Sequence, residues 1–438
     1  MRNAESALQD TVVAERPESV GDASLRRTLA FLGELFGGMR PRPFDVRLWD
    51  GTVWRGDYAA FTLVVRNPGA LRSMFTPPGD LALGEAYIFD DYDIEGDINA
   101  MFALLDHVEP ILADKTRLAK LGAMLLTLPK PDGRGQQRAA QLGGRTHTKK
   151  RDAEAIRYHY DVGNDFYRLW LDDAMVYSCA YFAEDGCSLD DAQQRKLDYL
   201  CRKLRLAPGD RLLDIGSGWG GLGVEAAKRG ATVLGVTLSP SQAELANERA
   251  SLAGVADRCR FEVRDYREVD EREPFDKLVS VGMFEHVGSG QLPGYFDKAV
   301  RLLRPGGAFL NHGISVDALR APARQPTFSQ RYVFPDGELL PIGRTLAMAE
   351  DAGFEVRDVE NLREHYALTL REWVRRLEER HAEAVAAADE TTYRIWRMFM
   401  SASAHGFETG LIGVHQSLLV KTERGRAGVP LTREDWYT

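Results

Sequence analysis

Three glycines that follow an apolar stretch have the clearest chemical implication in this chain. Residues 211–214 have the character of a buried strand, Gly216, Gly218 and Gly220 follow, and residues 222–228 continue as a helix. Glycine adopts backbone angles, and permits a close approach to a ligand, that a Cβ would prevent. A strand, a glycine turn and a helix in this order predict a site where backbone N–H groups bind a nucleotide-like ligand.

The residues after the glycine turn bear on which ligand binds there, because dinucleotide-binding proteins share such a turn. We expect a second strand over residues 231–236, which ends in Thr237, Leu238 and Ser239. A dinucleotide site usually carries an acidic residue at this point. Gln242 follows in the first turn of a helix capped by Ser239, and its amide is expected to bind ribose hydroxyls.

Four motifs in a fixed order resemble one enzyme family. They are YHYDVGNDFY at 158–167, YSCAYF at 177–182, the glycine turn, and VGMFEHVG at 281–288. Together they resemble the cyclopropane-fatty-acyl-phospholipid synthases, which are methyltransferases that use S-adenosylmethionine and are related to the mycolic acid cyclopropane synthases. The resemblance runs from about residue 153 to the C-terminus, and a weaker likeness covers residues 25–110.

The resemblance implies a reaction with strict demands on the site. The double bond of an unsaturated phospholipid acyl chain attacks the methyl group of S-adenosylmethionine, which leaves a carbocation on the acyl chain. A base then removes a proton from the added methyl group so that the cyclopropane ring closes. In this family a bound bicarbonate ion is held for that purpose. Such a pocket needs hydrogen-bond donors, an apolar wall and protection from water.

The resemblance assigns five positions to this anion pocket, namely Cys179, Glu285, His312, Ile314 and Tyr366. Glu285 follows the expected strand 278–281, and His312 ends the expected strand 308–311. Both therefore belong to the carboxyl edge of an α/β sheet, where such sheets bind ligands. We expect Glu285 to accept a hydrogen bond from His312 and to fix its tautomer, so that the imidazole binds the anion.

Other interpretations of these residues remain open. A cysteine beside an apolar run is often an inert core residue, and Tyr366 has a packing role as its alternative. His286, next to Glu285, is interpreted as a capping or packing residue. No H-E-x-x-H spacing is present, and no metal is expected. The chain has Ser217 where many relatives have cysteine and Gly313 where relatives commonly have threonine, and Gly313 leaves the product less certain.

The resemblance also implies a cofactor site for S-adenosylmethionine. Tyr177 and Ser178 resemble residues that hold the methionine carboxylate and amine, and the glycine turn provides backbone contacts. Asp214 is expected to order that turn. The complete predicted set is Tyr177, Ser178, Gly216, Gly218, Thr237, Leu238, Gln242, Asp265 and Tyr266, with Arg267 beside the last two at the adenine.

The resemblance implies an α/β fold: a seven-stranded, Rossmann-like methyltransferase domain preceded by a small α+β domain. We divide the chain into a flexible tail (1–24), an N-terminal domain for lipid handling and subunit contacts in a homodimer (25–128), a basic linker (129–152) and the methyltransferase domain (153–438). A hairpin is expected at Asp50–Gly51, with another strand over 61–65. The helical stretch 369–399 supplies an acyl channel or a packed core, with Trp373, Leu377, Tyr393, Trp396, Met398, Phe399 and Met400.

Charge and cysteine content limit the partners and the compartment. The net charge of −9 argues against nucleic acid. The segment from Lys130 to Arg151 nevertheless concentrates basic residues, and we expect it to contact anionic lipid. Residues 111–128 are expected to form one helix, either packed with a solvated basic face or lying on the bilayer. Four cysteines without C-x-x-C spacing, and no long apolar run, favour a cytoplasmic protein that binds peripherally to the inner face of the membrane.

Three alternative functions remain. The same carbocation could lose a different proton and give a methylene branch, although Cys179 and His286 are kept here and relatives with that outcome depart at these positions. Some family members methylate small amines, but those generally lack the N-terminal domain. A lipid-binding protein without catalysis is the third alternative, against which the retention of the pocket residues argues.

Overall fold

The computed structural model describes residues 23–130, 143, 146–160, 162–184, 186–319 and 326–437. They form two compact units. Unit 1 contains the described residues up to 130 together with segments within 323–333 and 389–405. Unit 2 contains the described residues of 140–322, 334–388 and 406–438. The residues expected to form the cofactor and anion sites all belong to unit 2.

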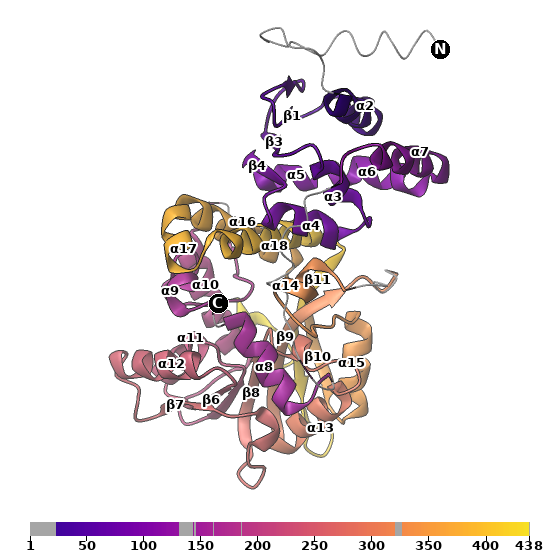
Figure 1. The fold of residues 1–438 in the computed structure, drawn as a ribbon. Helices are drawn as coiled ribbons and strands as arrows, with labels where there is room; N and C mark the ends of the chain where they lie inside the picture. Colours follow the sequence, from indigo (N-terminus) through magenta and orange to yellow (C-terminus); the bar gives the residue numbers. More distant parts are fainter. Residues whose placement is uncertain are drawn as a thin grey trace. The chain divides into compact units, whose positions relative to one another are not determined.

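Unit 2 is built on a seven-stranded sheet with the order β10-β11-β9-β8-β5-β6-β7 (Figure 1). Strands β9, β8, β5, β6 and β7 run parallel, whereas β11 is antiparallel to both of its neighbours. The strands are β5 (Arg211–Ile215), β6 (Thr232–Thr237), β7 (Cys259–Val263), β8 (Phe275–Val281), β9 (Leu303–Val316), β10 (Glu355–Asn361) and β11 (Ile412–Val420). The expected seven-stranded, mostly parallel sheet is thereby confirmed.

Helices cover both faces of this sheet, which explains why its strands are apolar on both sides. Adjacent residues of a strand point to opposite faces. Leu212 packs in the core with α10 (Leu189–Lys203), α11 (Gly221–Lys228) and α12 (Pro240–Leu252). Its neighbour Leu213 packs with α13 (Leu292–Leu302) and α15 (Ile342–Asp351). The other helices of unit 2 are α8 (Lys149–Tyr160), α9 (Asn164–Arg168), α16 (Arg363–Glu379), α17 (His381–Ala387) and the short helices η1 (Tyr266–Glu268), η2 (Phe284–His286) and η3 (Glu434–Trp436).

Unit 1 contains a four-stranded sheet of order β2-β1-β3-β4, and the expected small α+β domain is confirmed. Its strands are β1 (Phe44–Arg47), β2 (Val53–Trp54), β3 (Phe61–Val65) and β4 (Tyr92–Gly96). The expected hairpin forms at Asp50–Gly51, where Gly51 has φ +86° and β1 and β2 pair antiparallel. The helices are α2 (Ala23–Phe36), α3 (Ala70–Phe75), α4 (Asp80–Ile88), α5 (Ile98–Phe102), α6 (Leu104–Ala113), α7 (Lys115–Leu126) and α14 (Phe328–Tyr332).

The prediction of one helix over residues 111–128 is wrong. Helix α6 ends at Ala113, and Asp114 caps the start of α7. The carboxylate of Asp114 accepts hydrogen bonds from the backbone N–H groups of Thr116 and Arg117. An N-cap residue has an extended backbone, so it starts a new helix here although the apolar spacing continues. Among the described residues, no helix is both long enough and apolar enough to cross a bilayer.

The helical stretch expected over residues 369–399 is divided between the two units. Trp373 and Leu377 lie on α16 in unit 2. The remaining five residues of the predicted channel lie on α18 (Glu390–Glu408), in the part that belongs to unit 1. An acyl channel built from both sets stays a prediction.

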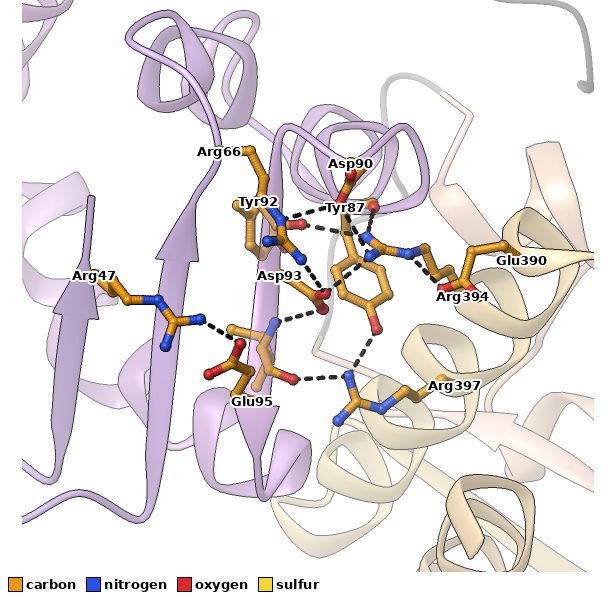
Figure 2. Close-up of polar contacts among 11 residues, drawn as sticks. Arg47, Arg66, Tyr87, Asp90, Tyr92, Asp93, Glu95, Glu390, Arg394 and Arg397 are labelled. Carbon is orange, nitrogen blue, oxygen red and sulfur yellow. Dashed lines mark hydrogen bonds and ion pairs between the residues drawn. The ribbon is translucent and has the colours of Figure 1, made fainter. Parts of the chain in front are cut away.

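Two buried arginines fasten α18 to the rest of unit 1 (Figure 2). Arg394 forms ion pairs with Asp90, at 3.0 Å, and with Asp93, at 2.9 Å. Arg397 donates hydrogen bonds to the Tyr87 hydroxyl, at 2.8 Å, and to the carbonyl of Ile94, at 3.1 Å. A segment distant in sequence is thus incorporated into the N-terminal unit by buried polar contacts.

Candidate functional site

The glycine turn has the backbone geometry that the sequence predicts. Gly216, Gly218 and Gly220 have φ values of +81°, +53° and +82°, which strongly favour glycine. The N–H groups of Gly216 and Ser217 donate to the carbonyl of Val236, so the turn is attached to the neighbouring strand β6. A Cβ on Gly220 would collide with Ala246, whereas a Cβ on Gly218 would have no atom within 4 Å. Gly220 therefore serves packing, and Gly218 borders open space.

The end of β6 presents a buried amide beside this turn. The hydroxyl of Thr237 donates to Oε1 of Gln242 at 2.8 Å, and Ser239 caps α12 through the N–H of Gln242. The amide nitrogen of Gln242 is buried without a protein hydrogen-bond partner. Leu238 is half-buried between them. An orphaned donor in a buried position suits a ligand hydroxyl, as predicted for the ribose.

The acidic residue after β7 is held by a neighbouring arginine. Asp265 accepts hydrogen bonds from the backbone N–H and from Nε of Arg267, at 2.9 and 2.8 Å. Burial alone would raise the pKa of Asp265, but Arg267 holds it below its usual value. Arg267 also pairs with Asp152 at 2.9 Å. Tyr266 is half-buried, with its ring edge against Tyr295. The Asp265 carboxylate is thus fixed and charged at the predicted adenine position.

Of the predicted residues Tyr177 and Ser178, the first is half-buried and the second is buried, and side chains of α10 bind Ser178. The Tyr177 ring packs against Trp170 and Trp373. The side chain of Gln193 donates to the carbonyl of Ser178 at 2.9 Å. Lys196 donates to the Ser178 hydroxyl at 2.8 Å. Both the backbone and the side chain of Ser178 are therefore positioned by α10.

Glu285 does not bind the His312 imidazole, so that expectation is wrong. Its Oε1 accepts a hydrogen bond of 2.7 Å from the backbone N–H of Ile314. The parallel ladder between β8 and β9 ends at the Val281–His312 pair, which leaves the next N–H of β9 without a partner on β8. Glu285 satisfies that group. Ile314 contributes through its backbone, while Oε2 of Glu285 remains without a hydrogen-bond partner.

His312 is buried with neither ring nitrogen hydrogen-bonded. Because side chains alternate along a strand, it lies on the same face of the sheet as Leu310, which packs toward α10. Gln416 is its register partner on β11. Asp214, two residues after Leu212 on β5, belongs to the same face. His312 and Asp214 are thus buried polar side chains near the carboxyl edge of the sheet, on the face that α10 covers.

Cys179 and Tyr366 approach this edge from outside the sheet. The Cys179 thiol donates to the carbonyl of Leu362 at 3.6 Å, and the N–H of Ala180 donates to the Thr369 hydroxyl at 3.0 Å. These contacts attach the segment to the start of α16. Burial, and then the proximity of Cys179 and Glu285, raise the pKa of the Tyr366 phenol well above its usual value. The structure therefore brings Cys179, Tyr366 and Glu285 into electrostatic range of one another.

The charge states of the pocket follow from its burial. Burial raises the pKa of the Cys179 thiol and the Tyr366 phenol well above neutral, so both stay protonated at pH 7. Burial lowers the pKa of His312 well below its usual value, which keeps the imidazole neutral. Burial raises the pKa of Glu285 to about 7. Cys179, Tyr366 and His312 are therefore neutral at pH 7, and Glu285 is the one of these four predicted residues that exchanges a proton readily near neutral pH.

Gly313 does not open the anion pocket. A Cβ at this position would overlap the ring of Phe284, which is buried in the core on the side of α13. Gly313 follows His312 directly and therefore faces the opposite side of the sheet. His286 is half-buried, its ring lies edge-on to Phe334, and desolvation lowers its pKa to about 4.

Lys196 and Gln193 are the residues near the site that the sequence analysis missed. They lie three residues apart on α10 and both face Ser178. A signal was present, because α10 has an amphipathic pattern in which Gln193 and Lys196 occupy the buried stripe together with Leu197 and Leu200. Polar residues on the apolar face of a helix require a buried partner.

Comparison with known families assigns most of the chain. The model of the mycolic acid cyclopropane synthetase family matches residues 147–417. A domain of unknown function matches residues 31–110. The first match includes the glycine turn, Glu285, His312 and Tyr366, and the second lies within unit 1.

Individual relatives agree with the family match. A probable fatty acid methyltransferase of Pseudomonas putida is 42% identical over 402 residues, covering 90% of this chain and 96% of the relative. The cyclopropane-fatty-acyl-phospholipid synthase of Escherichia coli is 37% identical over 261 residues, covering 59% and 66%. The solved structure of mycolic acid cyclopropane synthase CmaA1 with S-adenosylhomocysteine and CTAB superposes with a TM-score of 0.58 at 34% identity, covering 61% of this chain and 97% of that one. The chain belongs to the mycolic acid cyclopropane synthetase family and is an S-adenosylmethionine-dependent methyltransferase that acts on lipids.

Proposed function

We propose that this enzyme transfers a one-carbon unit from S-adenosylmethionine to the double bond of an unsaturated phospholipid acyl chain and forms a cyclopropane ring, with bicarbonate as the base. The observation that carries this proposal is that burial keeps the side chains of His312, Cys179 and Tyr366 neutral. A carbocation would be trapped by an ionised thiolate or phenolate, and burial keeps both groups protonated here. A pocket of this kind favours a separate, weakly nucleophilic base.

The described residues fit both small molecules. For S-adenosylmethionine, Gly218 borders open space, and the Gln242 amide nitrogen is a buried donor without a partner. When bound, this cofactor supplies the methyl group. For bicarbonate, the two ring nitrogens of His312 and Oε2 of Glu285 are buried polar atoms without protein partners. Buried polar groups of this kind usually bind a ligand or water.

Glu285 is suited to receive the proton that the anion removes from the added methyl group. Its Oε1 is fixed by the N–H of Ile314, and its Oε2 is buried without a hydrogen-bond partner. A carboxyl group with a pKa of about 7 exchanges protons readily at neutral pH. The pocket thus holds a proton acceptor that is itself restrained from attacking the cation.

A second product has specific support. The Pseudomonas putida relative, which matches over 90% of this chain, is named a probable fatty acid methyltransferase. A 1,2-hydride shift in the same cation would move the positive charge to the carbon that carries the new methyl group, and loss of a proton from that methyl group would then leave a methylene branch instead of a ring. The first step, the cofactor and the lipid substrate are shared by both candidates.

Mass spectrometry of lipids from a host that expresses the chain tests the proposal. Either product adds one CH₂ to each modified acyl chain relative to a host with an empty vector. Ozone cleaves a methylene branch and leaves a cyclopropane ring intact. A gain of CH₂ that resists ozone supports the ring, a gain that ozone cleaves supports the branch, and no gain contradicts both.

We also propose that the enzyme binds peripherally to the membrane that contains its substrate, since an acyl chain must leave the bilayer to reach a buried pocket. Of the basic residues between 130 and 151, those at 134, 138 and 145 lie outside the described residues. Lys149 pairs with Glu268, and Arg151 is hydrogen-bonded to Asp336. Lys130 is exposed, and Lys150 is almost fully exposed with Glu154 at 3.9 Å from its ammonium, so these two described residues of the set are available to meet an anionic surface.

A further inference from the structure

Lys196 is a buried cation that the mechanism above does not use. Its ammonium is 1% exposed, and its hydrogen bond to the Ser178 hydroxyl measures 2.8 Å. Within the described part of the chain, Ser178 is its one hydrogen-bond partner and no carboxylate lies within ion-pair distance. An ammonium has three donors and no acceptor. Two of its N–H groups therefore remain unsatisfied in a buried position, where such groups are costly.

The groups around Lys196 do not remove its charge. Burial lowers its pKa to about 8, which the nearby Asp172, Cys179 and Asp214 oppose, so the ammonium remains mostly charged at neutral pH. The carboxylate of Asp172 is occupied by the N–H groups of Ala174 and Val176. Burial raises the pKa of Asp214 to about 7, so this carboxyl is only partly ionised. His312, also in electrostatic range, is neutral. The cluster retains positive charge for which no protein anion is in contact.

The hydrogen bond from Lys196 also determines the donor role that remains for the Ser178 hydroxyl. A serine hydroxyl has one proton and two lone pairs. Because the ammonium can only donate, it occupies a lone pair, and the Ser178 proton must be given to another acceptor. Gln193 holds the carbonyl of the same residue, so the serine has little freedom to turn away. Ser178 is thereby prepared to donate to an acceptor that carries negative charge.

We propose that Lys196 is a positioning residue that acts through Ser178, orienting its hydroxyl toward a carboxylate-type oxyanion and stabilising that anion by its charge. The proposal rests on the proposed function, which supplies two such anions: the single carboxylate of S-adenosylmethionine and the bicarbonate ion. The hydroxyl lies beside Tyr177 at the predicted methionine end of the cofactor site, which favours the cofactor carboxylate. The two sources are separated by the experiment below.

The test compares two ligands that differ only in the amino-acid portion. Calorimetry measures the binding of S-adenosylhomocysteine, which carries the carboxylate, and of 5′-methylthioadenosine, which lacks it, to the full chain. Lys196→Met removes the charge at similar volume, a change that buried sites often tolerate. We expect the affinity for S-adenosylhomocysteine to fall about 10- to 100-fold, as for loss of a charge-assisted hydrogen bond, with the affinity for methylthioadenosine unchanged.

Further variants make the result decisive. Ser178→Ala should cause a similar loss, and the double variant should lose no more than about twofold beyond either single change, because Lys196 acts through Ser178. Lys203→Met is the matched control: this second buried lysine of α10 contacts Glu360 and Gln416 and should leave the ratio of the two affinities unchanged.

The bicarbonate arm measures turnover against bicarbonate concentration. If Lys196→Met raises the bicarbonate requirement while both nucleoside affinities are kept, the oxyanion is bicarbonate. Equal losses for both nucleosides, or no change in either the affinities or the bicarbonate requirement, overturn the proposal. A parent protein that binds S-adenosylhomocysteine but leaves lipids unmodified would contradict the proposed function without affecting this comparison.

Discussion

At the scale of single residues, the site depends on buried polar atoms that have been left without protein partners. The amide nitrogen of Gln242, both ring nitrogens of His312 and Oε2 of Glu285 are all of this kind. A folded protein usually satisfies such groups, so their gathering at the carboxyl edge of one sheet marks the place where ligands complete the hydrogen bonding. The following substitutions test individual residues of the proposed site.

Gly218→Val should abolish cofactor binding while the chain still folds. The φ of +53° strains a branched residue by about 1–2 kcal/mol, and its side chain would fill the open space that the cofactor requires. Gly209→Val is the matched control, because Gly209 also has a positive φ and open space but lies in the loop before β5. Calorimetry with S-adenosylhomocysteine should detect binding only by the control. Normal affinity of the Gly218 variant would remove the turn from the site.

Glu285→Gln should lower turnover by about 10²-fold without weakening S-adenosylmethionine binding. The amide oxygen still accepts from Ile314, but the side chain can no longer take up a proton. Because the raised pKa of about 7 means that the accepting carboxylate forms above this pH, parent turnover at constant bicarbonate concentration should rise through pH 7, and the variant should lack that rise. A variant with the parent rate and pH profile would refute the assigned role.

Gly313→Thr should destabilise the fold by about 1–3 kcal/mol through overpacking. The new Cβ would overlap the ring of Phe284. Combining it with Phe284→Ala should cost less than the sum of the two single changes, because each relieves the other's misfit. Urea unfolding of the three variants measures this coupling, and strictly additive values would show that the two positions do not share the space.

At the scale of elements, helices that are distant in sequence complete both units. Helix α10 precedes the glycine turn but fixes Ser178 through Gln193 and Lys196. Helix α18 follows most of the catalytic unit, yet its first four turns belong to unit 1 through Arg394 and Arg397 (Figure 2). In each case the contact is a buried hydrogen bond or ion pair, which fails if one partner is removed.

Arg394→Met should lower the free energy of unfolding more than Arg397→Met does. Arg394 pairs with Asp90 and Asp93, and removing one member of a buried pair costs about 3–5 kcal/mol; we expect the lower end because Arg66 still pairs with both acids. Arg397 donates to neutral oxygens, whose loss costs about 1–3 kcal/mol. Denaturant unfolding checks this order, and equal effects would mean that the ion pairs add nothing.

At the scale of the whole molecule, the proposed membrane binding would require an acidic protein to approach an anionic surface. The net charge of −9 opposes this approach, and only a local concentration of basic residues can reverse the effect within the screening distance of ~10 Å at moderate salt. Lys149 and Arg151 form ion pairs with Glu268 and Asp336 in unit 2. These acids partly neutralise their charges.

Replacing Arg134, Arg138, Arg145 and Lys150 with glutamine should weaken binding to anionic vesicles at least about tenfold at low salt, since each basic residue near the surface contributes ~1 kcal/mol. Activity on detergent-dispersed substrate should change much less. The control replaces four exposed arginines elsewhere with glutamine and so removes the same charge: Arg258, Arg260, Arg272 and Arg301. Equal vesicle binding by both variants, measured by co-sedimentation, would exclude the basic segment as the docking site.

The sequence by itself determined the features that depend on residues close together in the chain. The strand, glycine turn and helix, the hairpin at Asp50–Gly51 and the Ser239 cap of α12 all follow from local backbone preferences and short hydrogen bonds. The seven-stranded sheet followed from the family resemblance that the four ordered motifs carry, and the structure confirms it.

Only the tertiary structure decided which side chains meet. Glu285 binds the N–H of Ile314 instead of the His312 imidazole because the β8–β9 ladder ends at His312, two residues before Ile314. Gly313 is filled by Phe284 on the opposite face, and Lys196 reaches Ser178 from a neighbouring helix. These contacts depend on where strands end, on which face a residue points to and on how helices pack, which are properties of the assembled layers that no local pattern contains.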